Sequence, residues 1–223
     1  MNARDHIRIA GERTIGEWDA TRVRLAGAND QEAWKKAYND FFMERLKTRY
    51  FDPIDILRTP DSHTKEGHRP WRGEGFAIVA LQCSLIEFLG ATLKGQTYIL
   101  KSELKRLSRQ KTDEEYVESG EMFIDFLRSA HPFKNIFRND DDARDFYKSV
   151  RCGLLHEART RNNWRISSRK SPDLCIDVKD KVIYRNDLQD AFMTFADWYG
   201  SELLKNKEYQ KAFIRKFDSL CKD

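Results

Sequence analysis

Residues 76–93 read Phe-Ala-Ile-Val-Ala-Leu-Gln-Cys-Ser-Leu-Ile-Glu-Phe-Leu-Gly-Ala-Thr-Leu. The run is apolar at almost every position, and only Gln82, Ser84, Glu87 and Thr92 interrupt it. A helix with this pattern has no polar face, so the segment predicts a central, buried helix around which the rest of the chain packs. Glu87 is the only formally charged residue in the run, and a buried carboxylate needs a partner.

Apolar residues recur at helical spacing on both sides of this segment. They predict further helices over residues 30–50, 114–130, 141–156, 187–204 and 207–220. Residues 174–185 instead suit two short strands that flank Lys179-Asp180-Lys181, which predicts a β-hairpin. The predicted fold class is mainly α: a helical bundle with one small β-hairpin inserted between the helix over 141–156 and the last long helix.

The sequence predicts a short arm followed by one domain. Residues 1–28 are charged with scattered apolar residues, and we interpret them as an irregular or partly β N-terminal arm, while residues 29–223 form a single helical domain. Asn29 is the expected N-cap of the first helix, Glu32 completes a capping box, and this helix should end near Pro53. Residues 52–75 hold three of the five prolines, so we expect a long loop there that is either functional or mobile.

Composition and charge favour a soluble cytoplasmic protein. Of the 223 residues 34% are charged, and no apolar run approaches about 18 residues, so we expect no membrane span. The first residues lack the apolar segment of a secretory signal. The four cysteines stand far apart, and no cysteine or histidine pair has the spacing of metal ligands. Reduced thiols, no metal and no cofactor are therefore expected. A net charge of +4 does not by itself argue for a nucleic-acid partner.

One segment of the chain is strongly basic. Residues 144–170 contain eight basic and two acidic residues, a net charge of +6, so the remaining residues carry −2 of the total of +4. A local positive footprint of this kind suits the phosphate backbone of a nucleic acid. The candidate residues for binding it are Lys148, Arg159, Arg161 and Arg165. The alternative is a solvated basic face without a ligand.

The centre of this segment holds an arginine and a histidine separated by four residues, Arg151 and His156. In a chain with 22 arginines and 5 histidines, about 0.5 such pairs are expected by chance. Arg58 and His63 repeat the spacing in a stretch where Pro60 prevents a regular helix, and we interpret that copy as chance. The Arg151 pair lies in a predicted helix instead.

The helix that carries this pair has two apolar sides. At about 100° per residue, one arc consists of Phe146, Tyr147, Val150 and Leu154. Cys152 and Leu155 lie on the opposite arc, between Arg151 and His156. A second apolar side indicates contact with another surface, so Cys152 and Leu155 are the candidate residues of a dimer interface. The alternative is a helix buried on both sides within one chain.

The stretch Tyr147-Lys-Ser-Val-Arg-Cys-Gly-Leu-Leu-His-Glu-Ala resembles the signature helix of HEPN domains, small α-helical domains marked by an arginine, four to six residues and a histidine. The predicted helices over about 30–205 are similar to those of the family in their order: a long helix, a buried helix, the signature helix and a closing helix. Many active members place a small polar residue after the arginine, where this chain has Cys152.

The resemblance implies a metal-independent endoribonuclease, commonly part of a toxin–antitoxin or antiviral defence system, that dimerises through the signature helix. Its partners would be RNA, a second copy of the chain and an antitoxin or other defence-system protein. His156 would act as general acid or base and Arg151 as the phosphate clamp, while Glu87 would support the site, paired with Arg151 or His156. The products would carry a 2′,3′-cyclic phosphate and a 5′-hydroxyl.

Two alternatives remain open at this stage. In the first, the chain is a non-catalytic helical dimer that binds RNA or a partner protein, Arg151 and Glu87 form a structural ion pair, and His156 is a core or interface residue. In the second, the chain is a metal-dependent nuclease, because Pro172-Asp173 and Asp177-Val178-Lys179 resemble the metal-binding motif of restriction-type nucleases. Those nucleases draw their two acids from different strands of a larger sheet, and a gap of three residues is too short for that.

Overall fold

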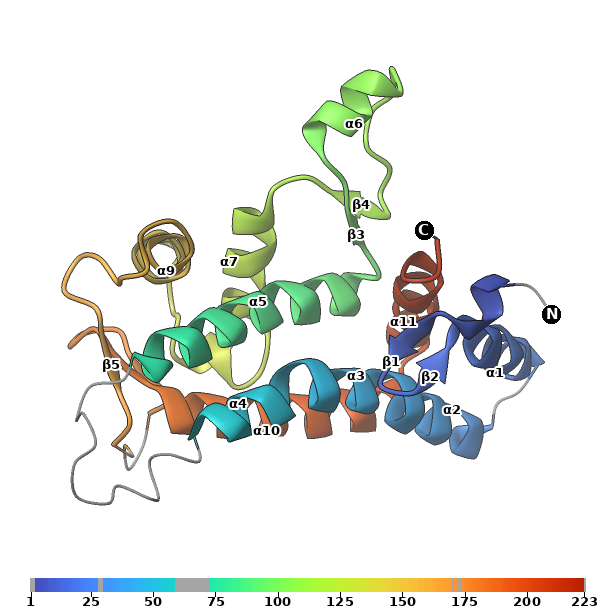
Figure 1. Ribbon diagram of the computed structural model, residues 1–223, viewed down its shortest axis with the longest axis horizontal. Coiled ribbons are helices and arrows are strands. Elements are labelled where there is room, and N and C mark those ends of the chain that lie inside the picture. The colour runs from blue at the N-terminus through green and yellow to red at the C-terminus, as the bar shows by residue number, and fades with distance from the viewer. Residues whose placement is uncertain (1–2, 28–29, 59–72, 170, 172–173, 223) are drawn as a thin grey trace. The chain divides into compact units, whose positions relative to one another are not determined.

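The computed structural model of the chain describes residues 3–27, 30–58, 73–169, 171 and 174–222; Figure 1 draws the others as a thin grey trace. Helices make up most of the described chain, and its strands form small sheets of two or three strands. The prediction of a mainly α fold is therefore confirmed. The chain groups into two compact units: the first contains Met1–Tyr50, Gly90–Ser119 and Ala196–Asp223, and the second contains Phe51–Leu89 and Gly120–Phe195.

Short strands and helices alternate along the first unit. Its elements are η1 (Ala3–His6), β1 (Arg8–Ala10), β2 (Arg13–Thr14), α1 (Ile15–Gly27), α2 (Gln31–Ala37), η2 (Tyr38–Met43), α3 (Glu44–Leu46), η3 (Lys47–Phe51), β3 (Thr97–Tyr98), α6 (Lys101–Arg106), β4 (Glu115–Tyr116) and α11 (Lys207–Ser219). The last residue of η3 already belongs to the second unit. β1 and β2 pair antiparallel, whereas β3 and β4 pair in parallel.

The second unit contains the helix with Arg151 and His156. Its elements are α4 (Asp52–Arg58), α5 (Glu74–Lys94), α7 (Ser119–Ser129), η5 (Phe133–Asn135), α8 (Asp140–Phe146), η6 (Tyr147–Cys152), α9 (Gly153–Glu157), β5 (Arg165–Ser167), β6 (Ile176–Asp177), β7 (Val182–Tyr184) and α10 (Arg185–Leu203). The last residues of α5 and of α10 belong to the first unit.

Residues 1–28, predicted as an arm outside the domain, belong to the first unit together with part of the predicted domain. The partly β character predicted for them is confirmed by the strands β1 and β2, but they also contain the 13-residue helix α1, which was not predicted. The Trp18 ring of this helix is completely buried, with ring centroids 5.1 Å from Phe41 and 5.2 Å from Phe217. The apolar pattern did not predict this helix because only a narrow stripe of its residues faces the core.

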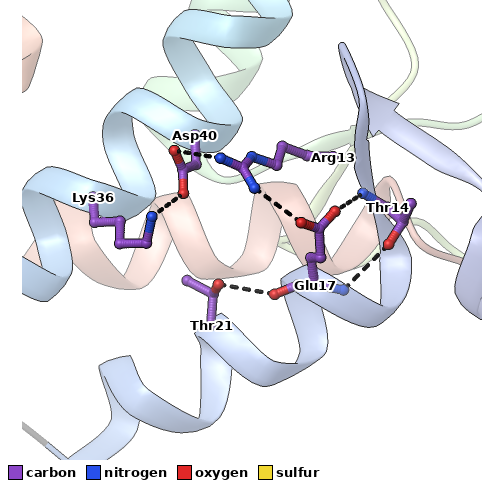
Figure 2. A network of polar contacts seen from close by, with 6 residues as sticks. All are labelled: Arg13, Thr14, Glu17, Thr21, Lys36 and Asp40. Atoms are coloured by element: carbon purple, nitrogen blue, oxygen red, sulfur yellow. Dashed lines mark hydrogen bonds and ion pairs between the residues drawn. The ribbon is translucent and has the colours of Figure 1, made fainter.

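A capping box and a network of ion pairs connect α1 with α2 and η2 (Figure 2). The Thr14 N–H donates to the Glu17 carboxylate at 2.9 Å, and the Glu17 N–H donates to the Thr14 hydroxyl at 3.4 Å. Arg13 bridges Glu17 and Asp40, and the Lys36 ammonium donates to Asp40 at 2.7 Å. The Thr-x-x-Glu signature of this box is present in the sequence, so the start of α1 was predictable from it.

The first predicted helix differs from expectation at both ends. Asp30 is the N-cap of α2, and its carboxylate accepts from the Glu32 N–H at 3.0 Å, so Asp30 has the role predicted for Asn29. The helical path continues through Pro53 to the end of α4, so residues 52–58 of the predicted loop 52–75 are helical instead. Proline usually interrupts a helix, because it has no N–H to donate and its ring crowds the preceding turn. Here the π-helical turn η3 widens the backbone just before Pro53 and lets the helical path continue. Residues 59–72 of that loop lie outside the described residues.

Aromatic side chains and α5 fill the core of the second unit. The ring centroids of Phe126 and Phe195 lie 5.1 Å apart, and those of Phe133 and Phe192 lie 5.2 Å apart. The completely buried residues of α5 include Ile78, Val79, Leu85, Ile86 and Leu89. The prediction that this helix is buried is therefore confirmed.

By length and composition alone, α5 is also long and apolar enough to cross a membrane, and it is the single helix of this kind in the described chain. The sequence analysis did not predict such a helix, because polar residues interrupt the run. Of the most apolar stretch of α5, 56% is buried inside the protein. A core helix of a soluble protein has the same properties, so the fold is compatible with a soluble protein.

The sheet of the second unit contains the predicted hairpin. β6 and β7 pair antiparallel, with Ile176 opposite Ile183, which confirms the hairpin expected near 174–185. β5 pairs in parallel with the other edge of β7, so the strand order is β5-β7-β6. As predicted, this sheet lies in the sequence between the helix that carries Arg151 and the last long helix, α10.

Candidate functional site

The helix with Arg151 and His156 begins at Asn139 and ends at Ala158. The Asn139 side chain accepts from the Asp142 N–H at 2.8 Å, and three aspartates follow in the first turn, where they suit the helix dipole. Ala158 ends the helix in the left-handed conformation, with φ of 52°. The helix is not regular, because its middle segment η6 has π-helical hydrogen bonding. Turns of this kind are rare and occur frequently at functional sites.

The two sides of this helix differ in burial much as the sequence predicts. The predicted core residues Phe146, Val150 and Leu154 are buried. On the other side, Arg151 and Cys152 are half-buried, and Lys148 and His156 are exposed. Leu155 leaves 63% of its surface exposed. Within the described chain the helix is therefore not buried on both sides, which removes that alternative.

Arg151 is held between an acidic and an aromatic side chain. Its guanidinium lies 3.5 Å from the Glu87 carboxylate of α5, and the two side chains are 21% and 19% exposed. The guanidinium carbon also lies 5.5 Å from the centroid of the Tyr147 ring, one turn earlier on the same helix, within the range of a cation–π contact. Of the two partners that the sequence suggested for Glu87, Arg151 and His156, the structure brings Arg151 close to it. A guanidinium has five N–H donors, so donors remain for a phosphate.

Tyr147 is a site residue that the sequence analysis assigned only to the core. Its ring packs against Phe123 with centroids 5.3 Å apart. Gly120 makes this packing possible, because a Cβ at that position would lie 2.9 Å from the Tyr147 ring. The available signal was the spacing of four residues between Tyr147 and Arg151, which places two helical side chains next to each other.

His156 lies in α9, after the π-helical turn, and its side chain is exposed. Among the described residues, no hydrogen bond or ion pair holds the imidazole. The structure therefore does not support a core histidine. An accessible imidazole can exchange protons with a ligand.

Cys83, the buried thiol near Arg151, is a poor candidate for a nucleophile. Burial raises the pKa of Cys83 to about 12, although the nearby Arg151 cation opposes the shift. Cys152 is half-buried beside Arg151. Among the described residues, no group of three or more histidine, cysteine, aspartate or glutamate side chains is arranged to hold a metal ion. The arginine, the histidine and Glu87 therefore carry the chemistry that this site can support.

The predicted RNA-binding residues are all on the surface, but two of them are paired with an acid. Glu157, directly after His156, accepts from the Arg159 guanidinium at 2.8 Å and also from Arg161. The hydrogen bonds from Arg161 and Arg159 lower the pKa of Glu157 to about 2. Arg165 donates to the Asp180 carbonyl at 3.2 Å, and Lys148 has no ionic partner in the described part of the chain.

The RNA-binding role predicted for Arg159 and Arg161 implies that removing the Glu157 carboxylate strengthens that binding. In Glu157→Gln the Arg159 and Arg161 cations no longer share an anion, so RNA affinity should rise by roughly two- to fivefold, the modest effect of exposed pairs. Fluorescence anisotropy with a labelled RNA measures this, in a His156→Ala background that prevents cleavage. Glu121→Gln, an exposed acid on α7, is the matched control. Unchanged or weaker binding by Glu157→Gln would contradict the assignment of Arg159 and Arg161.

The stretch that resembles the metal-binding motif of restriction-type nucleases, Pro172-Asp173 and Asp177-Val178-Lys179, lies partly in the hairpin. The Asp177 carboxylate accepts from the Asp180 N–H at 2.9 Å and so closes the turn between β6 and β7. This bond gives Asp177 a structural role. Pro172 and Asp173 of this stretch, like Lys170 of the basic segment, lie outside the described residues.

No protein-family model matches the chain, and no curated protein or solved structure matches it significantly. The candidate function therefore rests on the residues and their geometry. The features that carry it are the clamped Arg151, the exposed His156 and the basic surface around them.

Proposed function

We propose that the chain is a metal-independent endoribonuclease of the HEPN type. The observation that carries the proposal is the environment of Arg151: a half-buried guanidinium oriented by Glu87 and Tyr147, five residues before an exposed histidine. If Arg151 and Glu87 formed only a structural ion pair, neither the accessible imidazole of His156 nor the basic segment around it would be needed. Together these groups suit RNA, which has a phosphate to bind and a 2′-hydroxyl to activate.

The chemistry follows from the two side chains. His156 removes the proton from the 2′-hydroxyl or protonates the departing 5′-oxygen, because a neutral or charged imidazole can do either near neutral pH. Arg151 binds the phosphate as its negative charge grows, and the planar guanidinium can donate two parallel hydrogen bonds to it. Glu87 holds Arg151 in place for this contact. The products carry a 2′,3′-cyclic phosphate and a 5′-hydroxyl.

The proposed enzyme is a homodimer whose two signature helices meet. Leu155 exposes an apolar side chain beside His156, and Cys152 lies half-buried on the same side. A twofold axis near Leu155 brings two copies of Arg151 and His156 to one cleft, since the contacts of such an interface repeat symmetrically. One histidine can then act as base and the other as acid. The basic segments of both copies border the cleft and attract RNA.

The proposed biological role is that of a toxin in a toxin–antitoxin or antiviral defence system, located in the cytoplasm. An enzyme that cuts RNA without a cofactor damages its own cell unless it is restrained. The proposal therefore includes a neutralising partner protein. Growth arrest on overexpression, cured by His156→Ala, supports this role.

A second candidate is a non-catalytic dimer that binds RNA. Cys152 favours it, because many active members of the resembled family have a small polar residue after the arginine. The exposed His156 has no intramolecular partner in the described chain, which favours the enzyme instead. RNA binding without cleavage at any pH between 5 and 9 would support the second candidate.

RNA cleavage is expected to continue in excess EDTA, because Arg151 supplies charge stabilisation and His156 supplies proton transfer. The rate should show a bell-shaped dependence on pH around neutrality, from one acid and one base. The measurement is a single-turnover assay with labelled RNA, with and without chelator, and mass analysis of the 2′,3′-cyclic phosphate end. Cleavage lost in EDTA and restored by magnesium would contradict the proposal.

A further inference from the structure

Residues 158–164, which we call the strap, connect α9 to β5 and fold back along the signature helix. The Arg161 N–H donates to the Ser149 carbonyl at 2.8 Å, so the strap reaches the π-helical turn η6. The Arg159 carbonyl lies over Gly153, where a Cβ would be only 2.5 Å away. Asn162 and Asn163 both have positive φ, which asparagine tolerates better than most residues.

Asp145 anchors the strap to the helix. One of its carboxylate oxygens accepts from the Ser149 hydroxyl and the Asn162 amide, both at 2.7 Å. The other accepts from the Trp164 indole N–H at 3.0 Å and lies 3.1 Å from the Lys181 ammonium. Four donors from α8–η6, the strap and the hairpin thus converge on one side chain, which is 29% exposed.

These donors keep Asp145 ionised. Burial alone would raise its pKa, but the hydrogen bonds from Asn162, Ser149, Trp164 and Lys181 outweigh burial and lower the pKa to about 2. Because the pKa is depressed, the stabilisation is present above the unfolded-state pKa of about 4 and is lost as the pH falls toward 2. The anchor is therefore intact at the pH where the proposed enzyme works.

The strap bonds to the helix where its backbone widens beside Arg151. In a regular α-helix the Ser149 carbonyl accepts only from within the helix. Here a donor from outside, the Arg161 N–H, bonds to the same carbonyl in the middle of η6. Insertion of an external group into the hydrogen-bond ladder is a recognised cause of such irregularities. The π-helical turn in turn sets the direction in which Arg151 leaves the helix.

We propose that Asp145 is a positioning residue for this site: through the strap it holds the π-helical turn that orients Arg151 toward Glu87 and toward a phosphate. The catalytic part of this inference rests on the proposed ribonuclease function, whereas the coupling of Asp145 to the turn does not. Asp145 touches neither substrate nor Arg151. It acts through Ser149, Asn162 and Trp164.

The test uses two variants that disturb the strap in different ways. Asp145→Asn keeps the shape of the side chain but removes its charge and part of its acceptor capacity. Gly153→Ala adds a methyl group that pushes the Arg159 carbonyl off the helix and leaves Asp145 unchanged. Asp141→Asn is the matched control, the same chemical change at an exposed position of the same helix.

Hydrogen exchange of the full chain measures the coupling without reference to activity. Both strap variants should accelerate exchange by about tenfold or more in residues 159–164 and in residues 147–153, with little change in α7. Asp141→Asn should leave both segments as in the wild type. Faster exchange restricted to residues 159–164, with 147–153 unchanged in both variants, would overturn the inference.

Cleavage kinetics then test the consequence for the site. Both variants should lower kcat by about 10- to 100-fold, because Arg151 is displaced, and KM should rise as well, because Arg159 and Arg161 lie on the loosened strap. An unchanged kcat together with faster exchange at 147–153 would overturn the positioning role. If the wild type cleaves no RNA, the proposed function fails, and hydrogen exchange still decides whether Asp145 holds the turn.

Discussion

Replacing His156 by alanine is expected to lower the rate of RNA cleavage by roughly 10²–10⁴-fold, the usual contribution of a general acid or base. The fold should be unaffected, because the side chain is exposed and has no partner in the described chain. The free energy of unfolding should therefore change by less than about 0.5 kcal/mol. Single-turnover cleavage and urea denaturation of the same preparation measure both quantities.

Arg151→Lys is the companion variant for this test. A lysine keeps the positive charge next to the half-buried Glu87 carboxylate, whereas alanine would leave that carboxylate without its cation. The ammonium cannot make the two parallel hydrogen bonds of a guanidinium, so cleavage should fall strongly although RNA binding persists. Full activity of His156→Ala would place the chemistry elsewhere, and full activity of Arg151→Lys would mean that only the charge matters.

Leu155→Asp is expected to dissociate the dimer and to abolish cleavage with it. In a single chain Leu155 is 63% exposed, so an aspartate there should not destabilise the monomer. At the proposed twofold axis the same aspartate would be desolvated next to its own copy. The dissociation constant of the dimer should then rise by roughly 100-fold or more, the effect of an unpaired buried charge.

Light scattering at micromolar concentration measures the oligomeric state, and the RNA assay is run at the same concentration. Met193→Asp on α10 is the matched control, since Met193 is also a half-exposed apolar residue but lies outside the signature helix. It should stay dimeric and active. A wild type that cleaves RNA at the mass of one chain, 26.4 kDa, would refute the shared site.

Much of the architecture was predictable from local patterns. The apolar run of α5, the buried arc of Phe146, Val150 and Leu154, and the hairpin of β6 and β7 all follow from the spacing of apolar residues. Such spacing can be recognised from neighbouring residues alone, because a helix or strand repeats its faces every few residues whatever it packs against. The sequence also indicated that Glu87 needs a partner, because a carboxylate in an apolar helix is costly unless it is paired, and Arg151 was one of the two candidates.

Helix ends were less predictable, because capping depends on single residues. The N-cap of α2 is Asp30 and not its neighbour Asn29, although either side chain suits the role. Pro53 was expected to end the first helix, but the widened turn η3 before it lets the helical path continue. α1 was missed although Thr14 and Glu17 form a capping box, since only a narrow stripe of its residues faces the core.

The geometry around Arg151 depends on contacts between segments far apart in the sequence. The Ser149 carbonyl accepts from the Arg161 N–H of the strap, and the Asp145 carboxylate gathers donors from the helix, the strap and the hairpin. Pairings of this kind cannot be read from local spacing. The sequence alone identified Arg151, His156 and Glu87 as candidate site residues and the helices that carry them, but not the contact of Arg151 with Tyr147. The direction of Arg151, the pairing of Arg159 and Arg161 with Glu157, and the exposure of His156 and Leu155 became visible only in the folded chain, where long-range packing selects among conformations that are locally almost equal in energy.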